Sequence, residues 1–165
     1  MQNKRGVLIR ELKANEIFIP EDLLYEAHFQ AHEANPIPRD VIHVPGVRAY
    51  IQDFGKHKDD YCLAADLKGK TIGAVWVWIG AGEVKGYGNV DDKTTEFTIS
   101  LFKEYRNQGF GSLMMEKMIT YLTEDGYEQC SLSVEKRNYA VRMNQKLGFK
   151  IIDENEDDFI MLLKL

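Results

Sequence analysis

Short runs in which apolar residues dominate or alternate with polar ones predict the β-strands of this chain. The expected strands lie at 7–12, 61–67, 71–80, 94–102, 130–134, 150–153 and 159–165. Only Lys68, Gly69 and Lys70 separate the second run from the third, and such a glycine turn is typical of a β-hairpin. The three strands at 61–67, 71–80 and 94–102 are therefore expected to pair antiparallel.

Four other segments carry helical signals. Pro20 and the acidic residues after it predict a helix over roughly 20–34, which Pro36 would end. Short helices are expected over 47–54, with Gly55 as the cap, and within 138–149, ended by Gly148. The clearest helix spans 111–125, where Gly126 follows the end and one face collects Leu113, Met114, Met118, Tyr121 and Leu122.

The mixed order of these elements predicts the fold class. Strands and helices alternate in part, and three strands follow one another in the middle of the chain. This order favours an α/β or α+β fold with helices packed on one mixed sheet. At 165 residues the chain is long enough for one sizeable core, so a single domain spanning 1–165 is expected.

The net charge and the two cysteines limit which partners and which cell compartment are expected. The formal net charge is −5, and no face gathers the lysines and arginines that nucleic-acid binding needs, so nucleic acid is not an expected partner. Cys62 and Cys130 lie in apolar strand-like runs, as reduced thiols of a cytosolic protein do. The sequence has neither a signal-like N-terminus nor 18 consecutive apolar residues. A cytoplasmic protein without membrane contact is expected.

A turn with two glycines, residues 106–111, joins the strand at 94–102 to the helix at 111–125. A Walker loop needs Lys and then Ser or Thr after its last glycine, but Ser112 and Leu113 stand there. A dinucleotide fingerprint needs a small residue where Met114 stands. The remaining interpretation is a helix N-terminus that attracts phosphate oxygens, with glycines that allow a close approach. A glycine-rich connection without a ligand stays open from this turn alone.

Three motifs in chain order extend this interpretation. The turn has the order Arg, two residues, Gly, one residue, Gly, which resembles the pyrophosphate-binding motif of the GNAT superfamily, the acyl-CoA-dependent N-acyltransferases. Downstream, LSVEKRNYAVRMNQKLGF is similar to the second signature of that family, and upstream AADLKGKTIGAVWVW resembles its central hairpin. The resemblance implies a GNAT fold: a mixed, mostly antiparallel sheet of six to seven strands, splayed between the fourth and fifth, with about four flanking helices.

The resemblance also implies a cofactor and the residues that bind it. The co-substrate would be acetyl-CoA, and no metal is implied. Backbone N–H groups of the glycine turn would hold the pyrophosphate, and main-chain groups of the preceding strand would bind the pantetheine arm. The matching positions are Gln108, Gly109, Phe110, Gly111 and Ser112 for the pyrophosphate, with Arg106 alongside, then Ser100, Leu101 and Phe102 for the arm, and Asn138 facing the coenzyme.

The chemistry of amine acylation points to a carboxylate. A primary amine has a pKa near 10.4, so freeing its lone pair at pH 7 requires roughly 4 to 5 kcal/mol. A carboxylate can take that proton directly or through water. Glu96 stands where many members of the family keep such a glutamate, and a solvent-facing strand residue is the alternative. A main-chain N–H near Leu101 is expected to stabilise the developing oxyanion.

One position departs from the pattern of the family. Many members carry a Tyr six residues after the Asn, as the acid that protonates the leaving thiolate, and here that position is Asn144. A thiol with a pKa near 8.5 leaves tolerably without an acid, so catalysis remains the expectation. Water or another Tyr could serve, although the nearest, Tyr139, projects from a different face of the helix and favours a packing role.

The first expected helix and one strand carry further candidates. His28 and His32 stand four residues apart, a spacing that can bind metal, but without a third ligand no metal site is expected. In the family this region often walls the acceptor site, which implies acceptor contact for Tyr25, His28 and His32; helix packing is the alternative. Trp76 and Trp78 share a strand face and are interpreted as core or dimer packing, with 71–80 as a possible apolar edge of a homodimer.

Two functions follow from these patterns. The leading hypothesis is an N-acetyltransferase that moves acetyl from acetyl-CoA to a primary amine, on a small molecule or a protein, by direct attack in a ternary complex. The acidic balance favours a cationic small molecule. The alternative, supported by Asn144, is an acyl-CoA-binding or sensing domain with little or no turnover.

Overall fold

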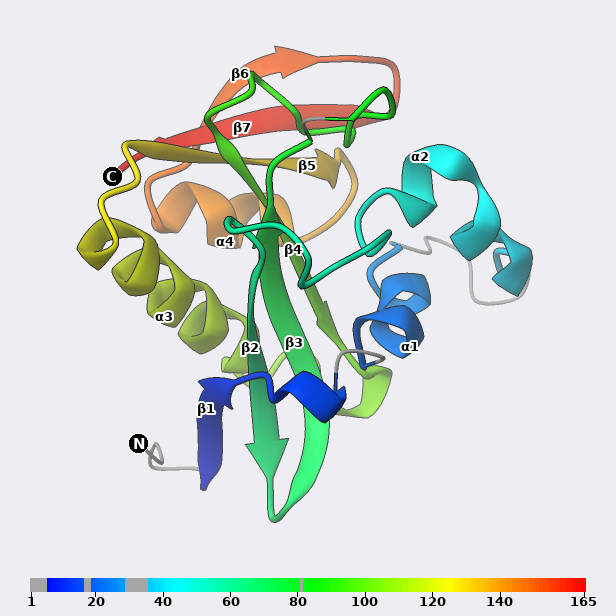
Figure 1. Ribbon diagram of the computed structural model, residues 1–165, viewed down its shortest axis with the longest axis vertical. Helices are drawn as coiled ribbons and strands as arrows, with labels where there is room; N and C mark the ends of the chain where they lie inside the picture. Colours follow the sequence, from blue (N-terminus) through cyan, green and yellow to red (C-terminus); the bar gives the residue numbers. More distant parts are fainter. Residues whose placement is uncertain (1–5, 17–18, 29–35, 81) are drawn as a thin grey trace.

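The computed structural model describes residues 6–16, 19–28, 36–80 and 82–165, and they build one seven-stranded sheet with helices on both faces (Figure 1). The strands are β1 (Val7–Glu11), β2 (Tyr61–Leu67), β3 (Lys70–Trp78), β4 (Thr95–Leu101), β5 (Gln129–Glu135), β6 (Lys150–Glu154) and β7 (Asp158–Lys164). The α-helices are α1 (Ile19–Glu26), α2 (Pro45–Arg48), α3 (Phe110–Glu124) and α4 (Ala140–Lys146), and single 3₁₀ turns occupy Ala14–Glu16, Arg39–His43 and Lys103–Tyr105. The predicted mixed sheet with about four helices is confirmed.

The sheet has the order β1-β2-β3-β4-β5-β7-β6 and one weak seam. All neighbouring strands pair antiparallel except β4 and β5, which run parallel. Only two residue pairs join these two strands, Thr95 with Cys130 and Glu96 with Ser131. Beyond them β4 and β5 diverge, as Figure 1 shows. The predicted splay between the fourth and fifth strands is confirmed.

The helix α3 covers one face of the sheet because its apolar residues recur at helical spacing. Phe110, Met114, Met118 and Leu122 are all buried in the main core, together with Met115. Residues of α4 pack against the same core. These two helices therefore form one layer over the sheet.

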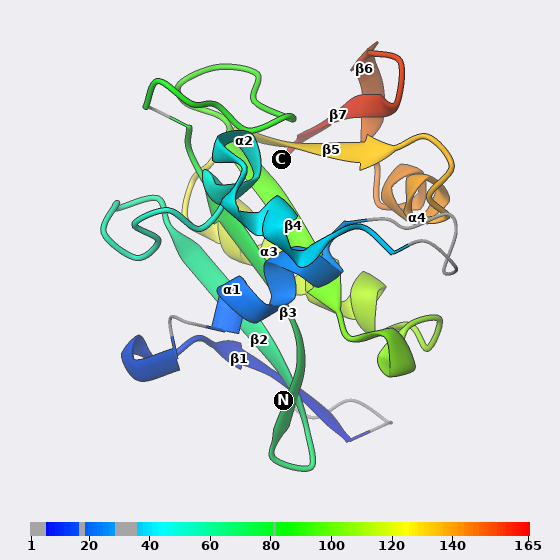
Figure 2. The same ribbon diagram turned by 90° about the vertical axis from the view of Figure 1, so that its right-hand side faces the viewer.

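The opposite face is covered by α1, α2 and the turns after α2 (Figure 2). Leu23 and Leu24 of α1 and Val47 of α2 pack in a second apolar cluster with Trp76 and Trp78 of β3. The indole N–H of Trp76, fully buried, donates a 3.1 Å hydrogen bond to the Tyr50 carbonyl. The predicted core packing of Trp76 is confirmed.

Two sequence-based predictions on this face were wrong. The first helix ends at Glu26, because the N–H of His28 bonds to the Tyr25 carbonyl in a tighter turn; residues 29–35 lie outside the described chain. The helix expected at 47–54 is the single turn α2, which begins at Pro45. A third correction concerns 71–80: β3 lies between β2 and β4 and so presents no free edge to a second copy.

Candidate active site between β4 and β5

The divergence of β4 and β5 opens a cavity of about 470 Å³. Phe97, Thr98 and Ile99 of β4 line one side, and residues 132–135 of β5 line the other. Leu24 and His28 reach it from α1, Tyr50 from the turns after α2, and Asn138, Ala140 and Asn144 from the region of α4. This cavity, called the cleft below, is bordered by several of the residues singled out in the sequence.

The main chain of β4 directs alternate residues into the cleft. The N–H of Phe102 donates to the Ile72 carbonyl at 3.0 Å, so the even-numbered residues of β4 bond to β3. The main-chain groups of Ile99 and Leu101 consequently face the seam with β5. Of the three residues predicted to bind the pantetheine arm, Leu101 faces the seam with β5 through its backbone, and the binding roles of Ser100, Leu101 and Phe102 stay predictions.

The glycine turn delivers the N-terminus of α3 to the end of β4. Gly109 takes a left-handed conformation at φ 84°, which a side chain would strain, and α3 begins at the next residue. The first N–H groups of the helix, on Phe110, Gly111 and Ser112, have no acceptor within it. The first turn contains no acidic residue, so nothing there cancels the positive end of the helix dipole. This terminus can hold phosphate oxygens.

Gln108 and Arg106 take more local roles with their side chains. The Gln108 amide donates to the Glu104 carbonyl at 3.0 Å. The Arg106 guanidinium donates to the Leu101 carbonyl at 2.9 Å and to the backbone and carboxylate of Glu26 at 3.0 Å. Arg106 thus fastens the end of β4 to the end of α1 through the Leu101 carbonyl, and the Leu101 N–H faces the seam with β5.

Two asparagines stand on the α4 side of the cleft. The Asn138 side-chain oxygen accepts the Ala140 N–H at 2.9 Å, so its NH₂ group remains for a ligand. Asn144 is 3% exposed, and its side-chain oxygen has no partner among the described residues. A buried acceptor without a donor destabilises the protein unless a ligand or water completes it. The same holds for the Thr98 hydroxyl on β4.

Glu96 lies at the point where β4 and β5 part, and it is 1% exposed. Burial raises its pKa to about 7, because the carboxylate has left water. The side chain of Tyr50 and the backbone of Gly88 lie close enough to oppose this shift, although neither makes a well-formed hydrogen bond. The interpretation of Glu96 as solvent-facing is wrong. At neutral pH this carboxyl group divides between its two protonation states.

The loop between β3 and β4 closes over Glu96, and sequence reasoning missed it. A β-carbon on Gly86 would lie 2.2 Å from Glu96 Oε1, so any other residue there would require the carboxylate to move. The Tyr87 N–H donates to the Tyr50 hydroxyl at 2.8 Å, and the Ser131 hydroxyl donates to the Gly88 carbonyl at 2.7 Å. The glycines at 86 and 88 were the only signal in the sequence for this close approach.

The predicted acceptor residues on the first helix separate into three cases. His28 lines the cleft, and its Nδ1 lies 3.1 Å from the Leu24 carbonyl. The Tyr25 hydroxyl donates to the Ile37 carbonyl at 2.6 Å, and Arg39 stacks on its ring, so its side chain is used within the fold. His32 lies outside the described residues. Across the described ranges, no group of three or more potential metal ligands is found.

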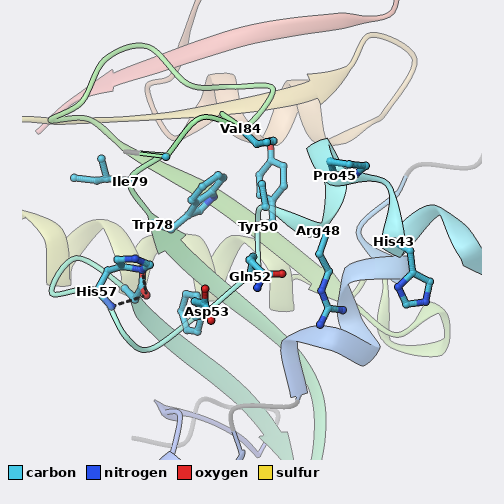
Figure 3. Close-up of a pocket in the computed structure, with 14 residues that line it drawn as sticks. His43, Pro45, Arg48, Tyr50, Gln52, Asp53, His57, Trp78, Ile79 and Val84 are labelled. Atoms are coloured by element: carbon cyan, nitrogen blue, oxygen red, sulfur yellow. Dashed lines mark hydrogen bonds and ion pairs between the residues drawn. The ribbon is translucent and has the colours of Figure 1, made fainter.

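A second cavity, of about 510 Å³, adjoins the cleft at Tyr50 (Figure 3). Tyr50 lines both spaces. The wall also includes Phe54, Trp78 and Val84. We call it the aromatic cavity. Its residues come from the segment 43–60, the end of β3 and the loop after β3, which lie far apart in the sequence, so the sequence did not group them.

Comparison with known proteins places these features in a family. The sequence pattern of the Acetyltransferase (GNAT) family matches residues 23–149, most of the chain. A curated relative, the [Ribosomal protein bS18]-alanine N-acetyltransferase of Haemophilus influenzae, is 36% identical over 62 residues. This match spans 38% of the chain and 42% of the relative, less than half of either.

Solved structures share the fold over nearly the full length. An acetyltransferase of the GNAT family from Streptococcus pneumoniae matches with a TM-score of 0.65 and 22% identity, covering 96% of this chain and 99% of that one. The PaiA N-acetyltransferase of Thermoplasma acidophilum, in complex with coenzyme A, matches with a TM-score of 0.69 and 19% identity, again covering 96% and 99%. At these identities the likeness establishes the fold. No helix in the described ranges is long and apolar enough to cross a membrane.

Proposed function

The chain belongs to the Acetyltransferase (GNAT) family, as its motifs predicted, and from that membership we propose that it transfers an acetyl group from acetyl-CoA to a primary amine by direct attack in a ternary complex. The observation that carries this proposal is the position of Glu96. A buried carboxyl group with a pKa of about 7 lies where β4 and β5 separate, beside the cleft.

Acetyl-CoA is the proposed substrate of the cleft. The pyrophosphate binds at the N-terminus of α3, held by the N–H groups of residues 108–112, since a helix N-terminus carries about half a positive charge. The pantetheine arm follows the free backbone edge of β4. The NH₂ of Asn138 and the unpartnered oxygen of Asn144 supply a donor and an acceptor for its amides. No metal takes part.

Glu96 is proposed as the general base. A base with a pKa near the working pH is ionised often enough to accept a proton and still drives the transfer. Glu96 is sealed from bulk water, and the proton therefore reaches it through a water molecule or the hydroxyl of Tyr50, which lines both cavities. The Leu101 N–H, which faces the seam with β5, stabilises the oxyanion.

Asn144 defines how the thiol leaves. An amide has no proton to transfer at neutral pH, so the thiolate of coenzyme A departs unprotonated and takes its proton from solvent. With a thiol pKa of about 8.5 this is a modest penalty near pH 8. Turnover is therefore expected to increase as the pH rises, without a falling limb from an enzymic acid.

A second candidate function is an acyl-CoA sensor without turnover. Two observations favour it: Asn144 replaces the acid, and Glu96 is covered by the loop that carries Gly86. A sensor needs only the cofactor site, which is the same in both proposals. The two proposals differ in whether thiol is released in the presence of an amine.

Further proposals concern the extent of the domain, the location of the protein and its partners. We infer one catalytic domain spanning 1–165, located in the cytoplasm, without a nucleic-acid partner. A homodimer stays a prediction, and sedimentation velocity would decide it.

The test combines binding with turnover. Acetyl-CoA should raise the melting temperature, and an acceptor panel followed by thiol release should find at least one consumed amine. Glu96→Gln should retain the thermal shift and lose most of the release. Thermal stabilisation with no release from any amine between pH 6 and 9 would favour the sensor. No stabilisation by acetyl-CoA or coenzyme A would overturn both candidates.

A further inference from the structure

The aromatic cavity lies next to the proposed base. Trp78, one of its walls, pairs with Glu96 across β3 and β4, and both side chains point to the same face of the sheet. Tyr50, another wall, packs edge-on against Trp78 with ring centroids 5.1 Å apart, and Figure 3 shows the two rings side by side. Val84 comes from the loop whose Gly86 contacts Glu96. A molecule in this cavity therefore contacts residues that are direct neighbours of Glu96.

The lining of the cavity favours an apolar, aromatic occupant. Its volume of about 510 Å³ falls among small-molecule sites, which typically measure roughly 300 to 1,000 Å³. Aromatic rings gain from edge-on and offset contacts with other rings, beyond the burial of their area. The rings and apolar side chains available are those of Pro45, Tyr50, Phe54, Trp78, Ile79 and Val84.

The charged residues around the cavity are already paired. Asp60 accepts the N–H groups of Gly55 and His57, and its side chain is 4% exposed. Asp53 pairs with Lys56 at 2.6 Å, and Arg48 pairs with Glu21 at 3.2 Å. Both carboxylates among the described lining residues, Asp53 and Asp60, are thus already paired, and neither is left for a second cationic group of a ligand.

One buried polar group in the wall lacks a partner. The indole N–H of Trp78, a residue 8% exposed, donates to no acceptor among the described residues. Leaving such a donor unpaired costs about 1 to 3 kcal/mol. An oxygen on the bound molecule would satisfy it.

Resting on the proposed acetyl transfer, we propose that the aromatic cavity binds the body of the acceptor and that the acceptor is an arylalkylamine carrying a hydroxyl group. The amine lies toward Tyr50 and Glu96, the aromatic ring packs among Tyr50, Phe54 and Trp78, and the hydroxyl oxygen accepts the Trp78 N–H. In the reaction the amine nitrogen bonds to the acetyl carbon, the carbon–sulfur bond breaks with its electrons on sulfur, and the amine proton passes to Glu96.

Calorimetry on the coenzyme A complex tests the site without turnover. Tyramine, phenethylamine, spermidine and an alanine-initiated tetrapeptide are titrated into the complex. Tyramine is expected to bind most tightly, then phenethylamine. Phe54→Ala should weaken both aromatic amines about 5- to 10-fold, the equivalent of one lost ring contact. Ile151→Ala, which trims an exposed apolar side chain on the distant β6, is the matched control and should leave both unchanged.

A second variant separates the hydrogen bond from the packing. Trp78→Phe keeps an aromatic ring and removes the N–H, so it should abolish the preference for tyramine over phenethylamine, about 2- to 10-fold for one hydrogen bond, and leave phenethylamine binding unchanged. Unfolding of this variant, if seen by circular dichroism, leaves Phe54→Ala to decide.

The outcomes separate this proposal from the proposed function. If coenzyme A binds and spermidine or the peptide is the one amine bound and acetylated, the aromatic cavity is not the acceptor site, while acetyl transfer stands. If the aromatic amines bind but Phe54→Ala changes neither affinity, the assignment is also overturned. Failure to bind coenzyme A removes the proposed function and this inference with it.

Discussion

The carboxylate of Glu96 lies against the α-carbon of Gly86, so closely that a β-carbon there would be 2.2 Å from Oε1 and 2.7 Å from Oε2. Contacts below 3.0 Å force a displacement, here of the buried carboxylate. The loop between β3 and β4 therefore sets the orientation of the proposed base. At position 86 this orientation requires glycine.

Gly86→Ala is accordingly expected to reduce kcat at least 10-fold, because the added methyl group displaces the Glu96 carboxylate, while acetyl-CoA affinity is unchanged. Steady-state kinetics and calorimetry measure the two effects. Glu83→Ala is the control, since it alters an exposed side chain of the same loop. Equal kcat values for Gly86→Ala and the wild type would contradict a base held by this contact.

The pH dependence of the rate should report Glu96. Its pKa of about 7 means that the ionised base accumulates as pH rises through 7, so kcat/KM should increase with a midpoint near that value. Glu96→Gln should lose this inflection and fall about 10²- to 10⁴-fold at pH 8. A profile from pH 5.5 to 9 measures both. A midpoint near 7 that survives in Glu96→Gln would assign the titration to another group.

Stability should depend on pH in the opposite direction. Burial raises the pKa of Glu96 from 4.5 to about 7, so folding favours the protonated form. This contribution is fully present below pH 4.5 and is lost as pH rises through 7. A shift of this size corresponds to about 3 kcal/mol, and Glu96→Gln does not titrate. Relative to that variant, the wild type should lose stability between pH 4.5 and 8.

Urea unfolding of both proteins at several pH values measures this difference. The wild type should approach or exceed the variant in unfolding free energy near pH 4.5 and fall below it near pH 8. A difference between the two proteins that does not change with pH would show that Glu96 keeps an ordinary pKa in the folded state.

Arg106 should matter through β4 and not through direct charge on the cofactor. Its guanidinium holds the Leu101 carbonyl and Glu26 together, and a lysine cannot reproduce both contacts. Arg106→Lys is expected to lose about 1 kcal/mol of stability and to lower kcat several-fold, because the Leu101 N–H is less well oriented.

Salt dependence distinguishes the two roles of Arg106. If Arg106→Lys weakens acetyl-CoA binding without affecting kcat, and the weakening follows ionic strength, the side chain contacts phosphate after all. Lys117→Ala, on the exposed face of α3, provides a control for the loss of a distant charge.

The sequence was sufficient for the elements with strong periodicity. The apolar run at 61–67 and the helical spacing of Met114, Met118 and Leu122 predicted β2 and α3 closely, because β2 is buried on both faces and α3 buries one continuous apolar face. The glycine turn was also predictable, since Gly109 requires a left-handed backbone just before α3. These features are local and need no knowledge of distant contacts.

The remaining parts depend on contacts between distant segments. Tyr50 approaches Glu96 from a segment without regular structure, and Arg106 bonds to Glu26, 80 residues earlier. The Tyr25 hydroxyl likewise bonds to the Ile37 carbonyl, 12 residues further along the chain. Neither periodicity nor a motif encodes such pairings.

The join between β4 and β5 consists of two residue pairs, fewer than any other pair of neighbouring strands in the sheet has. Four strands lie on one side of it and three on the other, and apart from loops and helices only Thr95, Glu96, Cys130 and Ser131 join the two half-sheets. A ligand that lies along the open edges would act as a missing strand between them. Binding of the ligand in the cleft would then also hold the two half-sheets together. The narrow join between β4 and β5 opens the cleft to the substrate, and the bound substrate would in turn bridge that opening.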